Sequence, residues 1–319
     1  PDFMKKTVSV VIATYNGEKY LKEQLDSILS QTYPVSEIII QDDRSTDSTP
    51  AICHRYEAKF PIIHFYENEN NIGFNLNFKS AAMKASCDLV ALSDQDDIWF
   101  PNKIEEEVTQ IGNYDLCFSD LTRGPELESA YRVSYEEGFT NHLFYCAMGH
   151  TMLLKKDFIR HNDYWQDYLN YDWSLLIHAD LEHGATKVNK PLNWHREHDC
   201  SVSRTIQLKK EKNKSYHELS KIAPYLHGFK KYREAEKTEK FQSFYQNFYN
   251  ATTSKEFKLE HKISQLLLSE NSMALFKLCL ICMWHRKEIG PTNKSKGIMG
   301  IIRGFFFPAI YYYHNNNFK

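Results

Sequence analysis

The stretch "TVSVVIATYNG", residues 7–17, is the strongest indication of the fold in this sequence. Its first eight residues are mostly β-branched and apolar without alternation, which is typical of a strand covered on both faces in a parallel sheet. Polar turn residues follow at once, and residues 17–31 then carry apolar side chains at helical spacing. The stretch therefore predicts a β-α unit.

The same order repeats along the chain, with strands expected at 36–43, 62–68 and 88–94 and helices between them. This alternation predicts an α/β fold, a doubly wound, mostly parallel sheet with helices on both faces. Further strands are expected at 114–120 and 149–156, and a helix near 171. Beyond about residue 205 the pattern is helical. We therefore predict a catalytic domain over 4–205 and a helical, basic region over 206–319.

The net charge of -2 hides a division between these parts. Residues 1–203 hold 18 Lys and Arg against 32 Asp and Glu, whereas residues 204–319 hold 21 against 9. A basic module suits an anionic partner such as a membrane surface or a phosphate-rich ligand. The alternatives are that the two halves attract each other, or that the apolar runs at 263–284 and 297–313 form an oligomer interface.

Seven cysteines are scattered without a paired framework, which favours reduced thiols in the cytoplasm. The one close pair, Cys279 and Cys282, lies in an apolar helical run, and a zinc site there is the less favoured alternative. No run reaches the roughly 18 to 20 apolar residues of a spanning helix. We expect a cytoplasmic protein, peripheral at the inner face of the cell membrane.

Polar clusters follow three of the expected strands: "TYNG", "QDDRSTD" and "SDQDD". Ligands of such sheets bind at the carboxyl ends of the strands. The crowded carboxylates of Asp94, Asp96 and Asp97 would repel one another unless a cation such as Mn²⁺ or Mg²⁺ neutralised them. The alternative is that they cap the next helix, and of the three Asp97 fits that role best. Asp42 and Asp43 would meet a base or ribose; the alternative is that Asp43 or Ser45 caps the next helix.

From about Thr7 to Ser203 the chain resembles the family 2 glycosyltransferases, inverting enzymes with the GT-A fold that use sugar nucleotides. The motifs that carry the resemblance are "VSVVIATYNGEKYLKEQLDSILSQTY", "IIIQDDRSTDST", "NNIGFNLNFKSA", "LVALSDQDDIWFPNKI" and "YDWSLLIHA". The segment "SDQDDIW" with Pro101 and Lys103 is most similar to bacterial rhamnosyltransferase-like members, which build surface polysaccharides such as O-antigen or capsule.

The resemblance implies roles for particular residues. Asp94-Gln95-Asp96 matches the DxD metal motif, with Asp96 as a direct ligand and His198 able to complete the metal shell. Asp172 matches the catalytic base, with Tyr171 standing where an acidic residue or histidine is common, and its alternative role is a helix cap. Arg196 would meet the diphosphate, whereas His195 is interpreted as structural. The residues expected at the sugar nucleotide are Ala13, Tyr15, Asn16, Asp42, Asp43, Asn71, Gly73, Asp94 and Arg196.

The implied function is metal-dependent, non-processive transfer of one sugar from a UDP-, GDP- or dTDP-sugar to a hydroxyl of a glycan or lipid-linked glycan. No nucleic-acid partner is expected, and a homo-oligomer is possible. Two alternatives stay open. One is a nucleotidyltransferase, although no glycine-rich phosphate loop follows the first strand. The other is a catalytically inactive module that binds a sugar nucleotide.

Overall fold

A computed structural model describes residues 5–166, 169–198, 219–290 and 296–315. The chain divides into two compact units, one of residues 1–137 with 146–201 and the other of residues 138–145 with 202–319. The boundary predicted near residue 205 lies outside the described residues. Segment 138–145 leaves the first unit and joins the second, which the sequence does not predict.

The first half of the sheet matches the expected β-α order. Its strands are β1 (Val8–Thr14), β2 (Glu37–Asp42), β3 (Ile63–Glu67) and β4 (Leu89–Ser93). They lie in the order β3-β2-β1-β4, and every pair is parallel. The connecting helices are α1 (Leu21–Leu29), α2 (Thr49–Lys59) and α3 (Phe74–Lys84). The carboxyl ends of all four strands therefore lie along one edge of the sheet.

The second half of the sheet is mixed. It consists of β5 (Ile98–Trp99), β6 (Leu116–Gly124), β7 (Tyr131–Val133), β8 (Met152–Lys155) and β9 (Ala185–Arg196). Beyond β4 the order is β8-β6-β9-β5, with β7 attached to β6. β6 and β9 are parallel, whereas β4 and β8, β8 and β6, and β9 and β5 are antiparallel.

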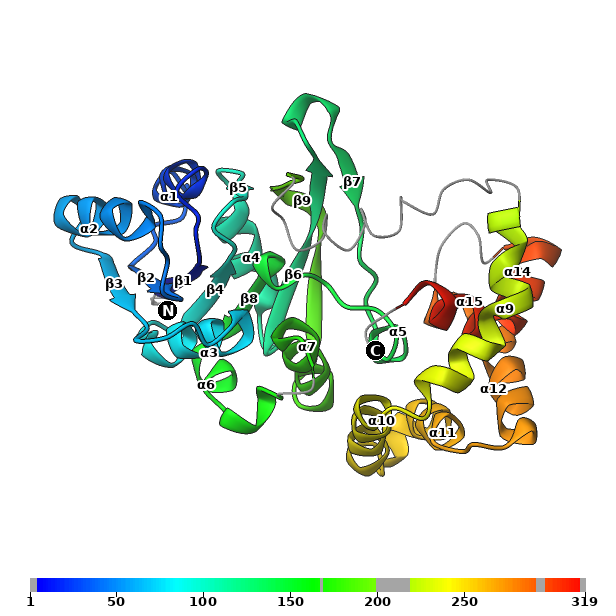
Figure 1. Cartoon of the computed structure of the whole chain (residues 1–319). Coiled ribbons are helices and arrows are strands. Elements are labelled where there is room, and N and C mark those ends of the chain that lie inside the picture. The colour runs from blue at the N-terminus through cyan, green and yellow to red at the C-terminus, as the bar shows by residue number, and fades with distance from the viewer. Residues whose placement is uncertain (1–4, 167–168, 199–218, 291–295, 316–319) are drawn as a thin grey trace. The chain divides into compact units, whose positions relative to one another are not determined.

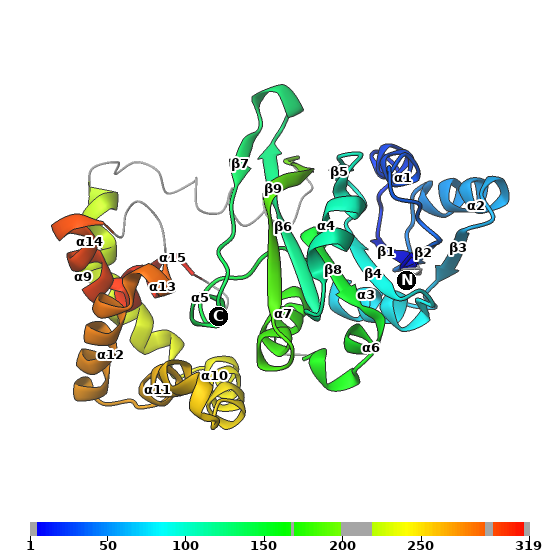
Figure 2. The same ribbon diagram turned by 180° about the vertical axis from the view of Figure 1, so that it is seen from behind.

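Helices cover both faces of the sheet (Figure 1 and, from behind, Figure 2). One core packs β-branched strand residues against α1, α2 and α4 (Lys103–Ile111). The other packs the opposite face against α3, α6 (Lys156–Ile159) and α7 (Tyr171–Leu181). The predicted fold class, a GT-A-like α/β sheet followed by a helical region, is confirmed.

The second unit is helical in its described part. Its helices are α5 (Phe139–His142), α9 (Leu219–Ala235), α10 (Glu239–Ala251), α11 (Lys258–Leu267), α12 (Ser272–Trp284), α13 (Arg286–Ile289), α14 (Gly297–Phe305) and α15 (Phe307–His314). α5 is held there because Thr140 donates to Glu260 and the Asn141 amide donates to the Ile289 carbonyl at 2.7 Å. No helix in the described ranges is both long and apolar enough to cross a bilayer.

Candidate active site

The loops after β1 and β4 are locked together by the side chain of Gln95. Its Oε1 accepts a hydrogen bond from the Tyr15 main-chain N–H at 3.0 Å, and its Nε2 donates to the Tyr15 carbonyl at 3.0 Å. Gly17 leaves room for this amide, because a Cβ there would lie 2.2 Å from Gln95 Oε1. Two of the three predicted polar clusters therefore form one structure, and the ring of Tyr15 is 49% exposed beside them.

Asp42 organises the turn after β2. Its carboxylate accepts hydrogen bonds from the Thr14 hydroxyl at 2.7 Å and from the Ser45 main-chain N–H at 2.7 Å. Asn16, in the left-handed region with φ 49°, accepts from the Thr46 N–H at 2.9 Å, and its own N–H donates to Ser45. The "TYNG" and "QDDRSTD" clusters are thus joined as well. A contact between Asp42 and a nucleotide stays a prediction.

Asp43 holds the segment that contains Asn71 and Gly73. Its two carboxylate oxygens accept from the main-chain N–H groups of Ile72 at 2.7 Å and Gly73 at 2.8 Å. The Asn71 side chain donates to the Asp43 carbonyl at 3.1 Å. The positive φ of Gly73, 81°, is a conformation that favours glycine. These predicted nucleotide-pocket residues lie together because Asp43 binds them.

Asp96 and His198 lie together, with His198 Nε2 2.7 Å from Asp96 Oδ2, and their role as metal ligands stays a prediction. Arg196 approaches the same aspartate, since its Nε donates to the Asp96 carbonyl at 3.3 Å. The guanidinium also lies over the ring of Tyr20 at 4.4 Å and forms an ion pair with Glu23. β9 therefore delivers a basic side chain and an imidazole to the DxD loop.

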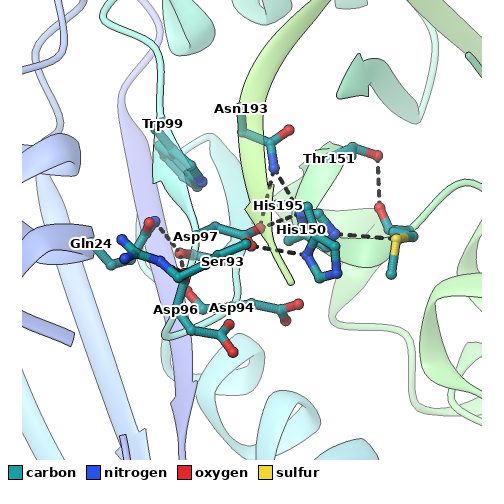
Figure 3. A network of polar contacts seen from close by, with 12 residues as sticks. Gln24, Ser93, Asp94, Asp96, Asp97, Trp99, His150, Thr151, Asn193 and His195 are labelled. Carbon is teal, nitrogen blue, oxygen red and sulfur yellow. Dashed lines mark hydrogen bonds and ion pairs between the residues drawn. The ribbon is translucent and has the colours of Figure 1, made fainter. Parts of the chain in front are cut away.

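Asp97 does not cap the following helix, so that interpretation is wrong. α4 begins at Lys103 with Asn102 as its N-cap, and the Asp97 side chain is fully buried. Its carboxylate binds His150 Nδ1 at 2.6 Å and His195 Nδ1 at 3.0 Å (Figure 3). The sequence does not reveal this role because both histidines are distant from Asp97 along the chain. The short 3-10 helix Gly149–Thr151 and β9 bring them to the turn after β4.

This buried histidine-aspartate cluster has its own electrostatics. Burial opposes the charge of Asp97, but the two imidazoles hold the pKa of its carboxyl well below the usual range. Burial likewise opposes charge on His150, yet the carboxylates of Asp97 and Asp94 raise its pKa to about 9. His195 Nε2 is buried without a hydrogen-bond partner in the described part of the chain. We infer that the cluster carries a charged His150 and fixes the turn that presents Asp94 and Asp96.

Asp94 is the carboxylate that most needs a cation. Burial, together with the charges of Asp97 and Asp96, raises its pKa to about 7 even though His150 acts in the opposite direction. Ligand atoms of Asp94, Asp97, His150 and His195 all lie within 4.8 Å of one another. Oxygen and imidazole donors of this kind suit divalent cations such as Mn²⁺. These four residues fit a metal only when His150 is neutral, because a charged imidazole does not bind a cation. Asp96 with His198 is the other carboxylate–imidazole pair near the end of β4.

Asp172 lies in the first turn of α7 and contacts the same 3-10 helix that contains His150. Its carboxylate accepts from the Trp173 main-chain N–H at 2.8 Å and from the N–H of Gly149. Burial raises its pKa to about 6 despite these donors. Asn170, and not Asp172, is the N-cap of α7. Asp172 is thus a half-buried carboxylate with a pKa close to neutral, as a general base requires.

Tyr171, which departs from the family pattern, belongs to the core. Its ring packs on Phe78 at 4.5 Å between centroids and is 5% exposed. A Cβ on Gly149 would lie 2.2 Å from the Tyr171 hydroxyl, so glycine is required opposite it. The ring sets the position of the 3-10 helix against α7, and no second acid stands beside Asp172 at this position.

A buried ion pair lies under α4. Lys103 and Glu107 are both fully buried and 2.5 Å apart, and Ser119 also donates to Glu107 at 3.1 Å. The Lys103 ammonium lies 5.1 Å from the centre of the Trp99 ring. Lys103 lies between Asn102 and Ile104 in the sequence, and its partner one helical turn later does not stand out from the other acids of "KIEEEV".

Comparison with known proteins gives a family and a fold. Residues 9–167 match the family described as glycosyl transferase family 2. The dTDP-rhamnosyl transferase RfbG of Shigella flexneri is 28% identical over 241 residues, which covers 66% of this chain and 83% of that protein. Other curated relatives are matched over less of their length: the chain spans 37% of an uncharacterised mycobacterial protein to which it is 35% identical.

Solved structures agree with the fold at low identity. The crystal structure of residues 1–349 of S. aureus TarS with UDP-GlcNAc has a TM-score of 0.60 and 15% identity, covering 96% of this chain and 89% of that chain. The mannosyltransferase PcManGT from Pyrobaculum calidifontis, in complex with GDP-Man and Mn²⁺, has a TM-score of 0.52 and 16% identity, covering 98% of this chain and 87% of that chain.

Proposed function

The chain belongs to glycosyl transferase family 2, and from that premise we propose that it transfers one sugar from a nucleoside-diphosphate sugar to a hydroxyl of a glycan or lipid-linked glycan. The transfer is proposed to invert the anomeric carbon, to be non-processive and to serve bacterial surface polysaccharide synthesis. The supporting observation is that Gly149 and His150, neighbours in one 3-10 helix, bind the candidate base Asp172 and the cluster behind the DxD loop.

The donor is proposed to lie across the ends of β1, β2 and β4. Ala13, Tyr15 and Asn16 line the nucleoside side, and Asp42 and Asp43 build the turns that complete it. The Asn71–Gly73 segment follows Asp43. Because RfbG is named a dTDP-rhamnosyl transferase, dTDP-sugars come first among the donors to test, whereas the structural neighbours hold UDP-GlcNAc and GDP-Man.

A divalent cation, Mn²⁺ or Mg²⁺, is proposed to be held by Asp94, Asp96 and His198. When bound, the cation offsets the negative charge that grows on the departing nucleoside diphosphate. Arg196 lies beside Asp96 and adds a guanidinium that suits phosphate oxygens. The buried cluster of Asp97, His150 and His195 keeps the turn in place. If His198 does not bind the metal, this cluster provides the alternative ligands.

Asp172 is proposed to take the proton of the acceptor hydroxyl while that oxygen attacks the anomeric carbon. The N–H groups of Gly149 and Trp173 hold its carboxylate in one orientation. Its pKa of about 6 leaves it ionised at neutral pH but still basic enough to accept a proton. A single displacement of this kind needs one base, unlike a retaining hydrolase with two carboxylates about 5 Å apart.

Isothermal titration with UDP, GDP and dTDP, with and without Mn²⁺, tests the proposal against its alternatives. Metal-dependent binding of one nucleotide is expected, followed by release of that nucleotide when the matching sugar donor and an acceptor are supplied. An inactive binding module would bind without turnover. A nucleotidyltransferase would instead bind a nucleoside triphosphate and a sugar phosphate. Absence of any metal-dependent nucleotide binding would remove the glycosyltransferase proposal.

A further inference from the structure

Helix α14 buries its glycines and exposes its isoleucines. Its sequence, "GIMGIIRGF", places Gly300 and Gly304 on the buried side, one helical turn apart. The bulky side chains point outward instead: Ile298 is 77% exposed and Ile302 is 40% exposed, and these two residues lie one turn apart on the same helical face. A helix folded only for stability would bury its isoleucines, so this exposed face points to an apolar partner.

Gly304 is required where it lies. A Cβ on Gly304 would come within 3.0 Å of the Met283 Cα atom and 3.2 Å of the Cys282 carbonyl oxygen. α14 can approach α12 this closely only because a glycine lies at the contact. A larger side chain such as isoleucine does not fit on that side of the helix. The outward position of the isoleucines is a consequence of the packing.

Helix α12 continues the apolar surface. Met273, Phe276 and Trp284 are 62%, 51% and 74% exposed and follow one another at helical spacing on one side. Phe276 packs edge-on against Phe305 of α14, with ring centres 6.0 Å apart, so the surfaces of the two helices adjoin. We call the exposed side chains of Met273, Phe276, Trp284, Ile298, Met299 and Ile302 the α12–α14 face.

The charge along α12 to α15 is mostly positive. Residues 272–315 contain six Lys and Arg, at 277, 286, 287, 294, 296 and 303, against the single acid Glu288. Lys277, Lys287 and Lys296 are exposed. Exposed apolar and aromatic side chains bordered by lysines are the pattern of a helix that lies in the interface of an anionic bilayer. A second copy of this chain would place basic side chains against basic side chains.

We propose that the α12–α14 face is the membrane-docking surface of this protein, with an anionic phospholipid bilayer as its partner. The apolar side chains enter the boundary between head groups and acyl chains, and the lysines contact the phosphate layer. Docking holds the chain at the surface where a lipid-linked acceptor lies. The attachment itself is independent of sugar transfer.

Flotation of the full chain with vesicles tests this proposal. We expect binding to phosphatidylcholine vesicles that contain phosphatidylglycerol, and little binding to phosphatidylcholine alone. The double variant Ile298→Ser with Ile302→Ser should lose about tenfold or more of its partition coefficient. Lys277→Glu should lose at least about fivefold on anionic vesicles, and added salt should reduce binding of the parent protein.

A matched control lies in the other unit, where Leu127 and Tyr131 are 43% and 57% exposed. The double variant Leu127→Ser with Tyr131→Ser should float like the parent. Nucleotide titration on every variant reports whether the catalytic unit is folded, and it separates this proposal from that of sugar transfer. Equal flotation of the Ile298 and Ile302 variant, or no flotation of the parent, would overturn the docking surface. The docking surface would also be overturned if the parent formed a concentration-dependent dimer and the Ile298 and Ile302 variant were monomeric.

Discussion

Replacing the candidate base by Asn should make the protein more stable while removing its activity. Burial raises the pKa of Asp172 from 3.8 to about 6, so the folded protein holds an ionised carboxylate at a disfavoured place. One pKa unit corresponds to about 1.4 kcal/mol, which puts the penalty at neutral pH at about 3 kcal/mol at most. Asp172→Asn removes that charge, and its amide oxygen still accepts from the Trp173 N–H.

The sign of the pH dependence follows from linkage. For an acid whose folded pKa is raised, the penalty is absent below the unfolded pKa near 4, grows between about 4 and 6, and is complete above 6. Thermal unfolding should therefore show Asp172→Asn several degrees more stable than the parent at pH 7.5, with the difference closing as the pH falls toward 4.

The same experiment distinguishes the two roles given to Asp172. A carboxylate that only stabilises the start of α7 interacts favourably with the helix dipole, and its loss costs about 0.3–1 kcal/mol. If Asp172→Asn is less stable than the parent at pH 7.5, burial does not penalise the Asp172 charge and the residue is structural. The parent protein, scanned in the same buffers, serves as the reference.

Three more outcomes are expected. At saturating donor and metal, turnover should fall about tenfold per pH unit below about pH 6 as Asp172 is protonated; a flat profile from pH 5 to 7 would argue against it. Asp96→Ala should weaken Mn²⁺-dependent nucleotide binding at least as strongly as His198→Gln, whose loss should be about 10- to 100-fold; equal nucleotide affinity with and without Mn²⁺ in the parent would contradict the metal site. Lys103→Met should destabilise the fold by about 3–5 kcal/mol by leaving Glu107 buried and unpaired, and Lys103→Met with Glu107→Met should recover most of that loss in urea unfolding.

The sheet could be predicted from the chain where local pattern and burial agree. The runs that form β1, β2 and β4 are apolar on both faces. Their positions along the chain, and the polar residues that follow each, can therefore be predicted from the sequence. β9 was not predicted, because its sequence "ATKVNKPLNWHR" mixes charges, a proline and buried residues without a period. Its pairing with β6 includes register shifts near Asp120 that no sequence rule anticipates.

The site divides in the same way. Asp94, Asp96 and Asp172 stand in motifs, so the sequence predicts them as site residues. The partners of Asp97 could not, since His150 and His195 are 53 and 98 residues away and meet it only through tertiary structure. The available signal was weak: a histidine flanked by buried residues in "NWHRE". The local sequence likewise does not predict that residues 138–145 belong to the helical unit, because this placement depends on distant partners such as Glu260.

Single-turnover sugar transfer by Asp172→Asn, with donor affinity measured on the same preparation, tests whether Asp172 is the catalytic base. We expect parental affinity for the sugar nucleotide in Mn²⁺ and a rate of transfer about 10²- to 10⁴-fold below that of the parent. Transfer at the parental rate by Asp172→Asn would contradict the assignment of the base, and with it the proposed mechanism.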